Sequence, residues 1–133
     1  VETVRAVAAS VTDVMDGEWG AREWERLVVN YESLLHTDEP QTSDISFAVA
    51  RESGAALELV DFRLSRAAKD GFQKIGAIMK AQKGQDWTVC DLVIERDGSY
   101  RFDFSYDRPY RLGGQLHDTR FDDYLERYQA EKA

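Results

Sequence analysis

Hydrophobic positions change their spacing several times along this chain, and each change marks a new element. Over about residues 3–16 the apolar side chains recur at helical spacing. The members of this stripe are Val4, Val7, Val11, Val14 and Met15. β-Branched and aromatic residues then dominate residues 24–35, 45–50 and 57–62, with turn-rich pieces between them. The pattern predicts one helix followed by three strands in an antiparallel meander.

The second half of the chain repeats this change from helical to strand spacing. Residues 65–83 carry an apolar helical face, and Gly84 is suited to end that helix. Two strands follow, over residues 87–95 and 99–107, and an aromatic stripe after Thr119 predicts a last helix. The element order α-β-β-β-α-β-β-α predicts a single α+β domain over residues 1–133. Its expected architecture is two-layered, with an antiparallel sheet of about five strands and three helices.

The strand at residues 99–107 shows the sharpest alternation in the sequence. One face carries Tyr100, Phe102, Phe104 and Tyr106, and the other carries Arg101, Asp103, Ser105 and Asp107. A two-residue turn at Asp97-Gly98 would bring charged residues of the preceding strand onto the aromatic face. A three-residue turn, with Gly98 left-handed in a bulge, pairs Glu95 with Ser99 and keeps that face apolar. We therefore expect the second register.

This register has an electrostatic consequence on the outer face of the hairpin. It places Asp91 directly opposite Asp103 and Asp107 opposite Trp87. Like charges that face each other across strands destabilise a sheet by a few tenths to about 1 kcal/mol. One interpretation is compensation by Arg101, Arg63 or solvent. The other is that the carboxylates are held for a cationic partner, either basic side chains of another protein or, with no complete ligand set visible, a divalent metal.

Charge and composition narrow the function classes. The 133 residues carry a formal net charge of -8, which speaks against nucleic-acid binding because phosphates must be neutralised by Lys and Arg. Residues 63–83 are the exception, with six bases against the single acid Asp70, as expected of a solvated helix face. No segment has the length and hydropathy of a membrane span or a signal peptide. A single cysteine, Cys90, fits a reducing compartment, so we expect a cytoplasmic protein.

Residues that could support catalysis are few. His36 and His117 lack a second ligand at zinc spacing, so we expect no metal site. Cys90 belongs to the aromatic face of its strand and should be a buried small hydrophobe. Nucleophile-elbow, P-loop and dinucleotide-binding motifs do not occur. We therefore expect a protein without enzymatic activity and without a cofactor.

A family resemblance rests on the same hairpin. The run Trp87-x4-Leu92, followed by Asp97-Gly98-x-Tyr100-x-x-Asp103-Phe104-x-Tyr106-Asp107, resembles the C-terminal signature of the YezG-like immunity proteins. The match is specific over about residues 86–107, and the earlier elements are similar in layout only, with Trp19 or Trp24 near the exit of the first helix. The resemblance implies a small bacterial antitoxin whose cognate partner is a polymorphic, often nuclease, toxin.

The acidic surface and the resemblance lead to one functional hypothesis. We expect a non-enzymatic inhibitor that covers the basic cleft of a toxin domain with carboxylates. The candidate contacts on the hairpin are Asp91, Asp103 and Asp107, with Trp87 as an aromatic anchor. A second candidate patch surrounds the first hairpin and consists of Glu32, Asp38, Glu39 and Asp44. The sequence does not rank the two patches.

Three alternatives remain open at the level of sequence. A regulatory α+β domain could hold a small molecule between the sheet and a helix. An enzyme would need His117, Asp118 and a hairpin carboxylate to converge in a cleft. Edge strands and the partly apolar outer positions Trp87, Val89 and Val93 could also support a homodimer.

Overall fold

The computed structural model describes most of the chain, with gaps in the connections. The described residues are 2–13, 23–34, 41–52, 54–84, 87–107, 109, 111–112, 114 and 119–132. The helices among them are α1 (Glu2–Asp13), α3 (Arg66–Lys83) and α4 (Tyr124–Lys132), and a short 3₁₀ turn, η1, spans Thr119–Phe121. The strands are β1 (Glu23–Leu34), β2 (Gln41–Arg51), β3 (Glu58–Asp61), β4 (Val89–Glu95) and β5 (Tyr100–Ser105).

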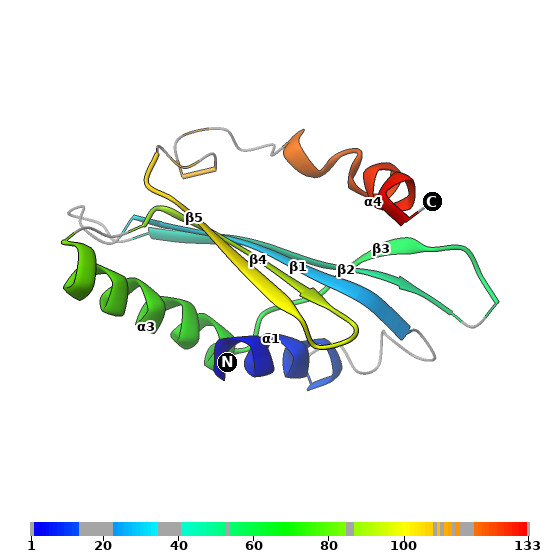
Figure 1. The fold of residues 1–133 in the computed structure, drawn as a ribbon, viewed down its shortest axis with the longest axis horizontal. Coiled ribbons are helices and arrows are strands. Elements are labelled where there is room, and N and C mark those ends of the chain that lie inside the picture. The colour runs from blue at the N-terminus through cyan, green and yellow to red at the C-terminus, as the bar shows by residue number, and fades with distance from the viewer. Residues whose placement is uncertain are drawn as a thin grey trace.

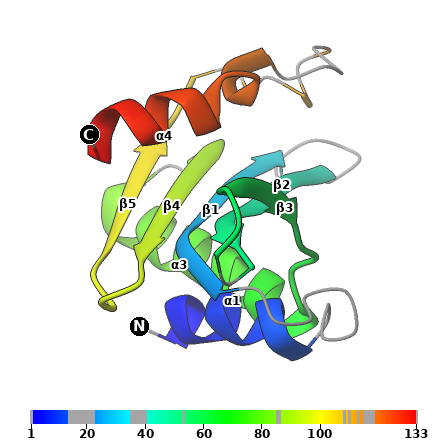
Figure 2. The ribbon, with the colours of Figure 1, turned by 90° about the vertical axis from the view of Figure 1, so that its right-hand side faces the viewer.

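The five strands form one antiparallel sheet in the order β3-β2-β1-β4-β5. Figure 1 shows α1 and α3 under this sheet and α4 above it. The predicted α+β class and element order are confirmed. The structure adds that α4 covers the face opposite to α1 and α3, so the central strands are buried on both sides (Figure 2).

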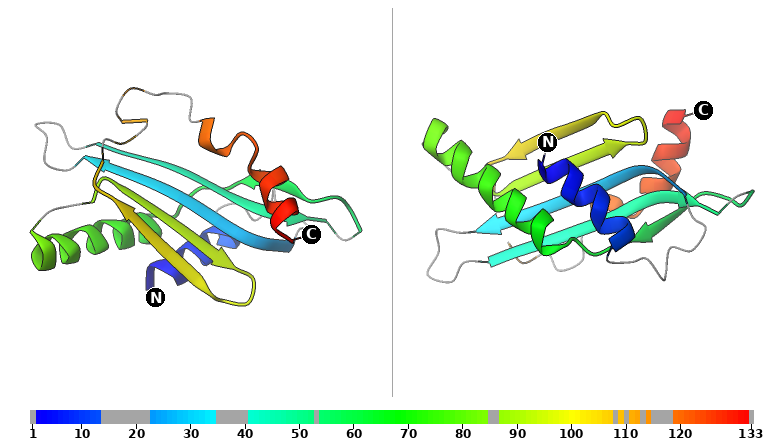
Figure 3. Two further views of the ribbon diagram at one scale, coloured as in Figure 1. Left: turned by 45° about the horizontal axis from the view of Figure 1, so that its top comes forward. Right: turned by 90° about the horizontal axis from the view of Figure 1, so that it is seen from below.

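The main core lies between the sheet and the helix pair α1 and α3, which Figure 3 shows from below. Alternate residues of β1, Leu27, Val29 and Tyr31, point into it because strand side chains change face at every residue. Tyr31 stacks on Phe72 of α3 with ring centroids 4.8 Å apart. The apolar stripe of the first helix enters the same core through Val7, which is fully buried.

Helix α3 begins and ends as its sequence indicates. The Ser65 hydroxyl accepts a hydrogen bond from the Ala68 amide at 3.2 Å, which caps the first turn. At the other end, Gly84 adopts φ 78° and donates its amide to the Lys80 carbonyl. Helix α1 crosses α3 at Gly71, where the side chain of Thr3 occupies the space that a Cβ would need. The absence of a side chain at Gly71 therefore sets how closely these helices approach.

The packing on the other face of the sheet, under α4, includes buried polar residues such as Arg26, Asn30 and Glu32. Phe47 of β2 packs edge-on against Phe121 and Tyr124, with centroids 5.6 and 5.0 Å away, so η1 and α4 rest on this face. The expected helix from Thr119 is therefore divided into a 3₁₀ turn and a helix that begins at Tyr124. Among the described residues, no helix is long and apolar enough to cross a membrane.

Candidate partner-binding surface

The β4–β5 hairpin has the register that the hydrophobic pattern predicts. The Glu95 amide donates to the Ser99 carbonyl at 2.8 Å, and Gly98 has φ 93°. As a result Asp91 faces Asp103 across the two strands. Both side chains project to the face of the sheet on which α4 lies, because the alternate residues Cys90 and Leu92 enter the core on the other face.

Asp91 is the more enclosed member of this pair. It is half-buried, and its Oδ1 accepts a hydrogen bond from Asn30 Nδ2 at 2.6 Å. Burial raises the pKa of Asp91 above its ordinary value, and the charge of Asp103 adds to this increase. The hydrogen bond from Asn30 and the positive charges of Arg120 and Arg111 act in the opposite direction. The environment of Asp91 thus penalises its ionised form.

Asp103 and Asp107 are exposed. Arg101 Nε lies 3.0 Å from Asp103 Oδ2, so the expected compensation by Arg101 is present, but as a surface ion pair. Asp107 lies two residues beyond β5, and its amide donates to the Ser105 hydroxyl at 3.2 Å. We call Asp91, Asp103 and Asp107 the acidic hairpin face.

The expected outward position of Trp87 is wrong. Trp87 is 3% exposed and lies in the main core, with its ring centroid 6.1 Å from that of Tyr31. Thr88 donates its amide to the carbonyl of Ser105, the residue that Val89 faces in the ladder. Two residues of one strand then oppose one residue of the other, as in a β-bulge, so the alternation shifts by one position before β4. Trp87 is therefore not available as an aromatic anchor for a partner.

Glu32 cannot belong to the predicted acidic patch around the first hairpin, because it is fully buried (0% exposed). The Arg111 and Leu112 amides donate to its two carboxylate oxygens at 3.2 and 2.9 Å. The guanidinium groups of Arg111 and Arg120 lie 3.6 and 3.5 Å from Oε2. Glu32 thus holds the segment after β5 against the sheet, and its expected role as a surface contact is wrong.

Of the other three residues of that patch, the structure describes only Asp44. Asp44 is half-buried and accepts a hydrogen bond from the Ser46 hydroxyl at 3.3 Å. Asp38 and Glu39 lie outside the described residues. The same holds for both histidines, His36 and His117, and for Asp118.

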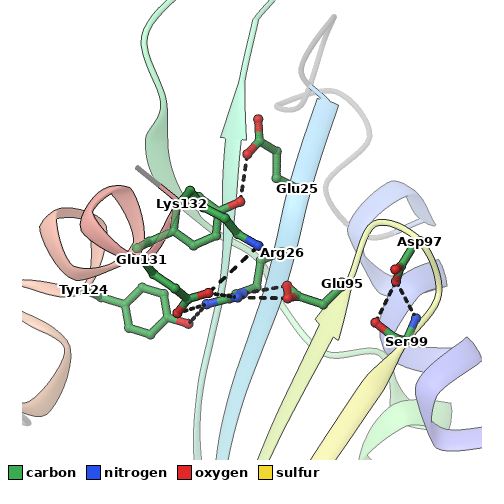
Figure 4. Close-up of polar contacts among 9 residues, drawn as sticks. Glu25, Arg26, Glu95, Asp97, Ser99, Tyr124, Glu131 and Lys132 are labelled. Atoms are coloured by element: carbon green, nitrogen blue, oxygen red, sulfur yellow. Dashed lines mark hydrogen bonds and ion pairs between the residues drawn. The ribbon is translucent and has the colours of Figure 1, made fainter.

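A network centred on Arg26 joins β1 to the C-terminal helix (Figure 4). Arg26 binds Glu95 in a bidentate manner, with Nε and Nη2 at 2.6 and 2.8 Å, and reaches Glu131 of α4 at 2.5 Å. It also donates to the Tyr124 hydroxyl at 3.3 Å. The hydrogen bond to Glu95 is the main reason why the pKa of Arg26 is raised. The arrangement anchors α4 to the sheet.

Two further groups hold the same helix. The Tyr128 hydroxyl donates to Glu25 Oε1 at 2.7 Å, and this bond lowers the pKa of Glu25. Burial, together with that carboxylate, raises the pKa of Tyr128 to about 12.

Beside the helix, a cavity of about 360 Å³ opens between α4 and the hairpin, and Arg26, Glu95, Arg101 and Glu131 are among its lining residues.

The described residues offer limited means for chemistry. Cys90 is buried as expected, and burial raises its pKa, so its thiol stays protonated at neutral pH. No group of three or more His, Cys, Asp or Glu side chains within the described ranges is placed to hold a metal ion. The surface does carry carboxylates on the antiparallel β4–β5 hairpin.

Arg26, Asn30 and Arg111 have structural roles that the sequence does not indicate. Arg26, Asn30 and Glu32 alternate along β1 and so share one face, which the pattern would assign to solvent. Their partners lie far along the chain, with Arg111 as many as 81 positions from Asn30, and no local spacing signals such a contact.

Neither a protein-family model nor a curated protein matches this chain. The resemblance to YezG-like proteins thus rests on the hairpin residues alone.

Proposed function

We propose that this chain is a non-enzymatic binding protein, an inhibitor of the immunity-protein type that covers a basic, nuclease-type toxin domain. The acidic hairpin face would make the contact. The observation that carries the proposal is the facing pair Asp91 and Asp103, which the sheet keeps although its like charges have to be offset by the hydrogen bond from Asn30 and the exposed ion pair with Arg101. Residues that weaken a fold locally are often kept for function.

The charge of the acidic hairpin face and its regular backbone both suit such a contact. A nuclease cleft is lined with Lys and Arg because it must bind phosphates. A cluster of carboxylates on an inhibitor raises the association rate with such a cleft and orients the encounter. Regular strands supply a preorganised surface, which lowers the entropy cost of binding. Asp103 and Asp107 are exposed, and in the proposed complex they would accept charge-assisted hydrogen bonds from Arg or Lys of the partner.

The first experiment uses the protein encoded by the gene adjacent to that of this chain. Its purified form should bind this chain tightly, and binding should weaken as salt is raised from about 0.05 to about 0.5 M, because screening shortens the range of the attraction. Calorimetry gives the affinity, and a nuclease assay gives the inhibition. A neighbouring protein that is neither bound nor inhibited contradicts the proposal.

The second experiment tests the surface. Asp103→Asn combined with Asp107→Asn should weaken binding by about tenfold or more, since each lost carboxylate leaves a basic group of the partner without its counter-charge. The matched control is Glu52→Gln with Asp70→Asn, which changes the net charge equally at exposed positions, one directly after β2 and one on α3. Equal loss of affinity in both double variants would mean that only overall charge matters and would refute the assignment of this face.

The second candidate function is the binding of a small molecule between the sheet and α4. The cavity of about 360 Å³ beside Arg26 and Arg101 is the observation that favours it, and its basic groups suit an anionic ligand. Arg26, however, is already bound by two carboxylates. Thermal-shift measurements with phosphate and with dicarboxylates test this alternative, and a rise in melting temperature that Arg101→Gln abolishes would favour it.

A further inference from the structure

The outer edge of β5 is an unpaired strand edge. β5 is the last strand of the sheet, and no strand among the described residues pairs with its far side (Figure 2). Antiparallel ladders alternate, and Glu95 bonds to Ser99, so Ser99, Arg101, Asp103 and Ser105 direct their backbone groups toward β4. Tyr100, Phe102 and Phe104 consequently direct their amides and carbonyls to the open side.

The same edge gathers apolar side chains that the fold leaves exposed. Among the described residues, the exposed large hydrophobics are Ile78 (56%), Tyr100 (45%) and Tyr106 (38%). Tyr100 and Tyr106 lie in β5 or directly after it, and Ile78 of α3 lines a groove of about 430 Å³ together with Phe102 and Phe104. An unpaired edge beside an apolar groove is the usual geometry for the addition of a strand.

The sequence of β5 is complementary to itself in one antiparallel register. If two copies pair about a two-fold axis through Phe102, Arg101 of each copy faces Asp103 of the other. Tyr100 then faces Phe104, and Phe102 faces its own counterpart, on the side of the groove. Every outward amide and carbonyl of these three aromatic residues gains a partner in this register.

Other antiparallel registers of two β5 strands bring less favourable side chains opposite each other. A shift that centres the pair on Arg101 places two guanidinium groups opposite each other, and a shift that centres it on Asp103 places two carboxylates opposite each other. Intermediate shifts bring the aromatic row against the charged row. The charge pattern around Phe102 therefore specifies both the partner and its register.

We propose that a second copy of this chain adds to β5, so that two five-stranded sheets join into one continuous antiparallel sheet across a two-fold axis. This inference shares Asp103 with the inhibitor proposal, but its test is separate, because the measured quantity is the mass of the chain alone. The β3 edge is less suited to pairing, since that strand has four residues and carries the exposed acids Glu58 and Asp61 at its ends.

The test is a set of charge reversals read by light scattering and sedimentation equilibrium. At concentrations on the order of 100 µM, the wild-type chain should have twice its 15.2 kDa mass. Arg101→Glu or Asp103→Arg alone should weaken the dimer by roughly tenfold, because symmetry repeats each like-charge pair twice. Both side chains are exposed (70% and 64%), so circular dichroism and thermal unfolding should show an intact fold.

Two controls isolate the register from net charge. The double variant Arg101→Glu with Asp103→Arg keeps the net charge of -8 and restores the opposite pairs, so its dimer should recover to near wild-type strength. A mixture of the two single variants should form a heterodimer, since every facing pair then has opposite charges, and native mass spectrometry separates it from the homodimers. A wild-type mass of 15.2 kDa overturns the proposal, as does a dimer that the single reversals leave unchanged.

Discussion

Glu32 and Asp91 are carboxylates on the same face of the sheet, but their surroundings differ. Glu32 is fully enclosed and has two backbone amides and two guanidinium groups around it. Asp91 is half-buried and faces Asp103, another carboxylate, across the strands. The charge of Glu32 is therefore compensated within the fold, whereas burial penalises the ionised form of Asp91.

Replacing Glu32 by glutamine should lower the free energy of unfolding by about 3 kcal/mol. The substitution removes the carboxylate that lies 3.6 Å from the largely buried guanidinium of Arg111, and removing one partner of a buried ion pair is strongly destabilising. Urea unfolding followed by fluorescence gives the value. Arg101→Gln is the control, since it removes an exposed ion pair and should change stability by at most about 1 kcal/mol. Similar losses in both variants would contradict the structural role of Glu32.

Replacing Asp91 by asparagine should stabilise the protein at neutral pH. The amide keeps an acceptor for Asn30 and removes both the desolvation penalty and the repulsion from Asp103. We expect a gain of about 0.2–1 kcal/mol at pH 7.

The gain from Asp91→Asn should depend on pH with a definite sign. A raised pKa means that the folded protein holds the proton more tightly than the unfolded chain, so wild-type stability falls as pH rises from about 4 through the folded-state pKa. The variant lacks this loss, and its advantage should vanish near about pH 3. Urea titrations across this range, with Asp103→Asn as the exposed counterpart, measure the difference. A variant that is less stable than the wild type at pH 7 refutes the assignment.

At the scale of elements, the packing of α1 on α3 depends on one missing side chain. Gly71→Ala should destabilise the protein by about 1 kcal/mol, because its Cβ would overlap the buried side chain of Thr3 and overpacking outweighs the gain in helix propensity. Gly76→Ala is the matched variant on the same helix. Its Cβ would lie 3.6 Å from Trp87 Nε1, an ordinary contact, so the propensity gain of about 0.5–1 kcal/mol should be retained. Chemical denaturation compares the two, and equal stabilities contradict the close approach.

The elements also show how far the sequence predicts the candidate site. The β4–β5 register follows from the alternation of aromatic and charged residues, so the facing of Asp91 and Asp103 is predictable. The bulge at Thr88 is not, because a single extra residue before β4 has no hydrophobic signature, and it turns Trp87 into the core. The burial of Glu32 is equally hidden, since its amide donors lie 79 and 80 positions away.

The whole molecule carries a net charge of -8, although α3 contains five basic residues and one acid. An excess of one sign destabilises a compact chain through self-repulsion, which salt screens. Raising NaCl from about 0.05 to about 0.5 M should therefore raise the melting temperature by a few degrees. Differential scanning calorimetry at constant protein concentration measures the shift. A fall in melting temperature would mean that screened ion pairs, such as that of Arg26 with Glu131, outweigh the repulsion.

Because β1 lies at the centre of the sheet, one of its edges stays unpaired during part of the synthesis of the chain. β1 pairs with β2 through a short connection, but its other neighbour, β4, begins only at Val89 and follows α3 in the chain. As the chain leaves the ribosome, the first three strands are complete before β4 emerges, and β1 is then a nascent edge with Leu27, Val28 and Val29 on it. That interval is the point at which the growing chain is most open to aggregation or chaperone capture.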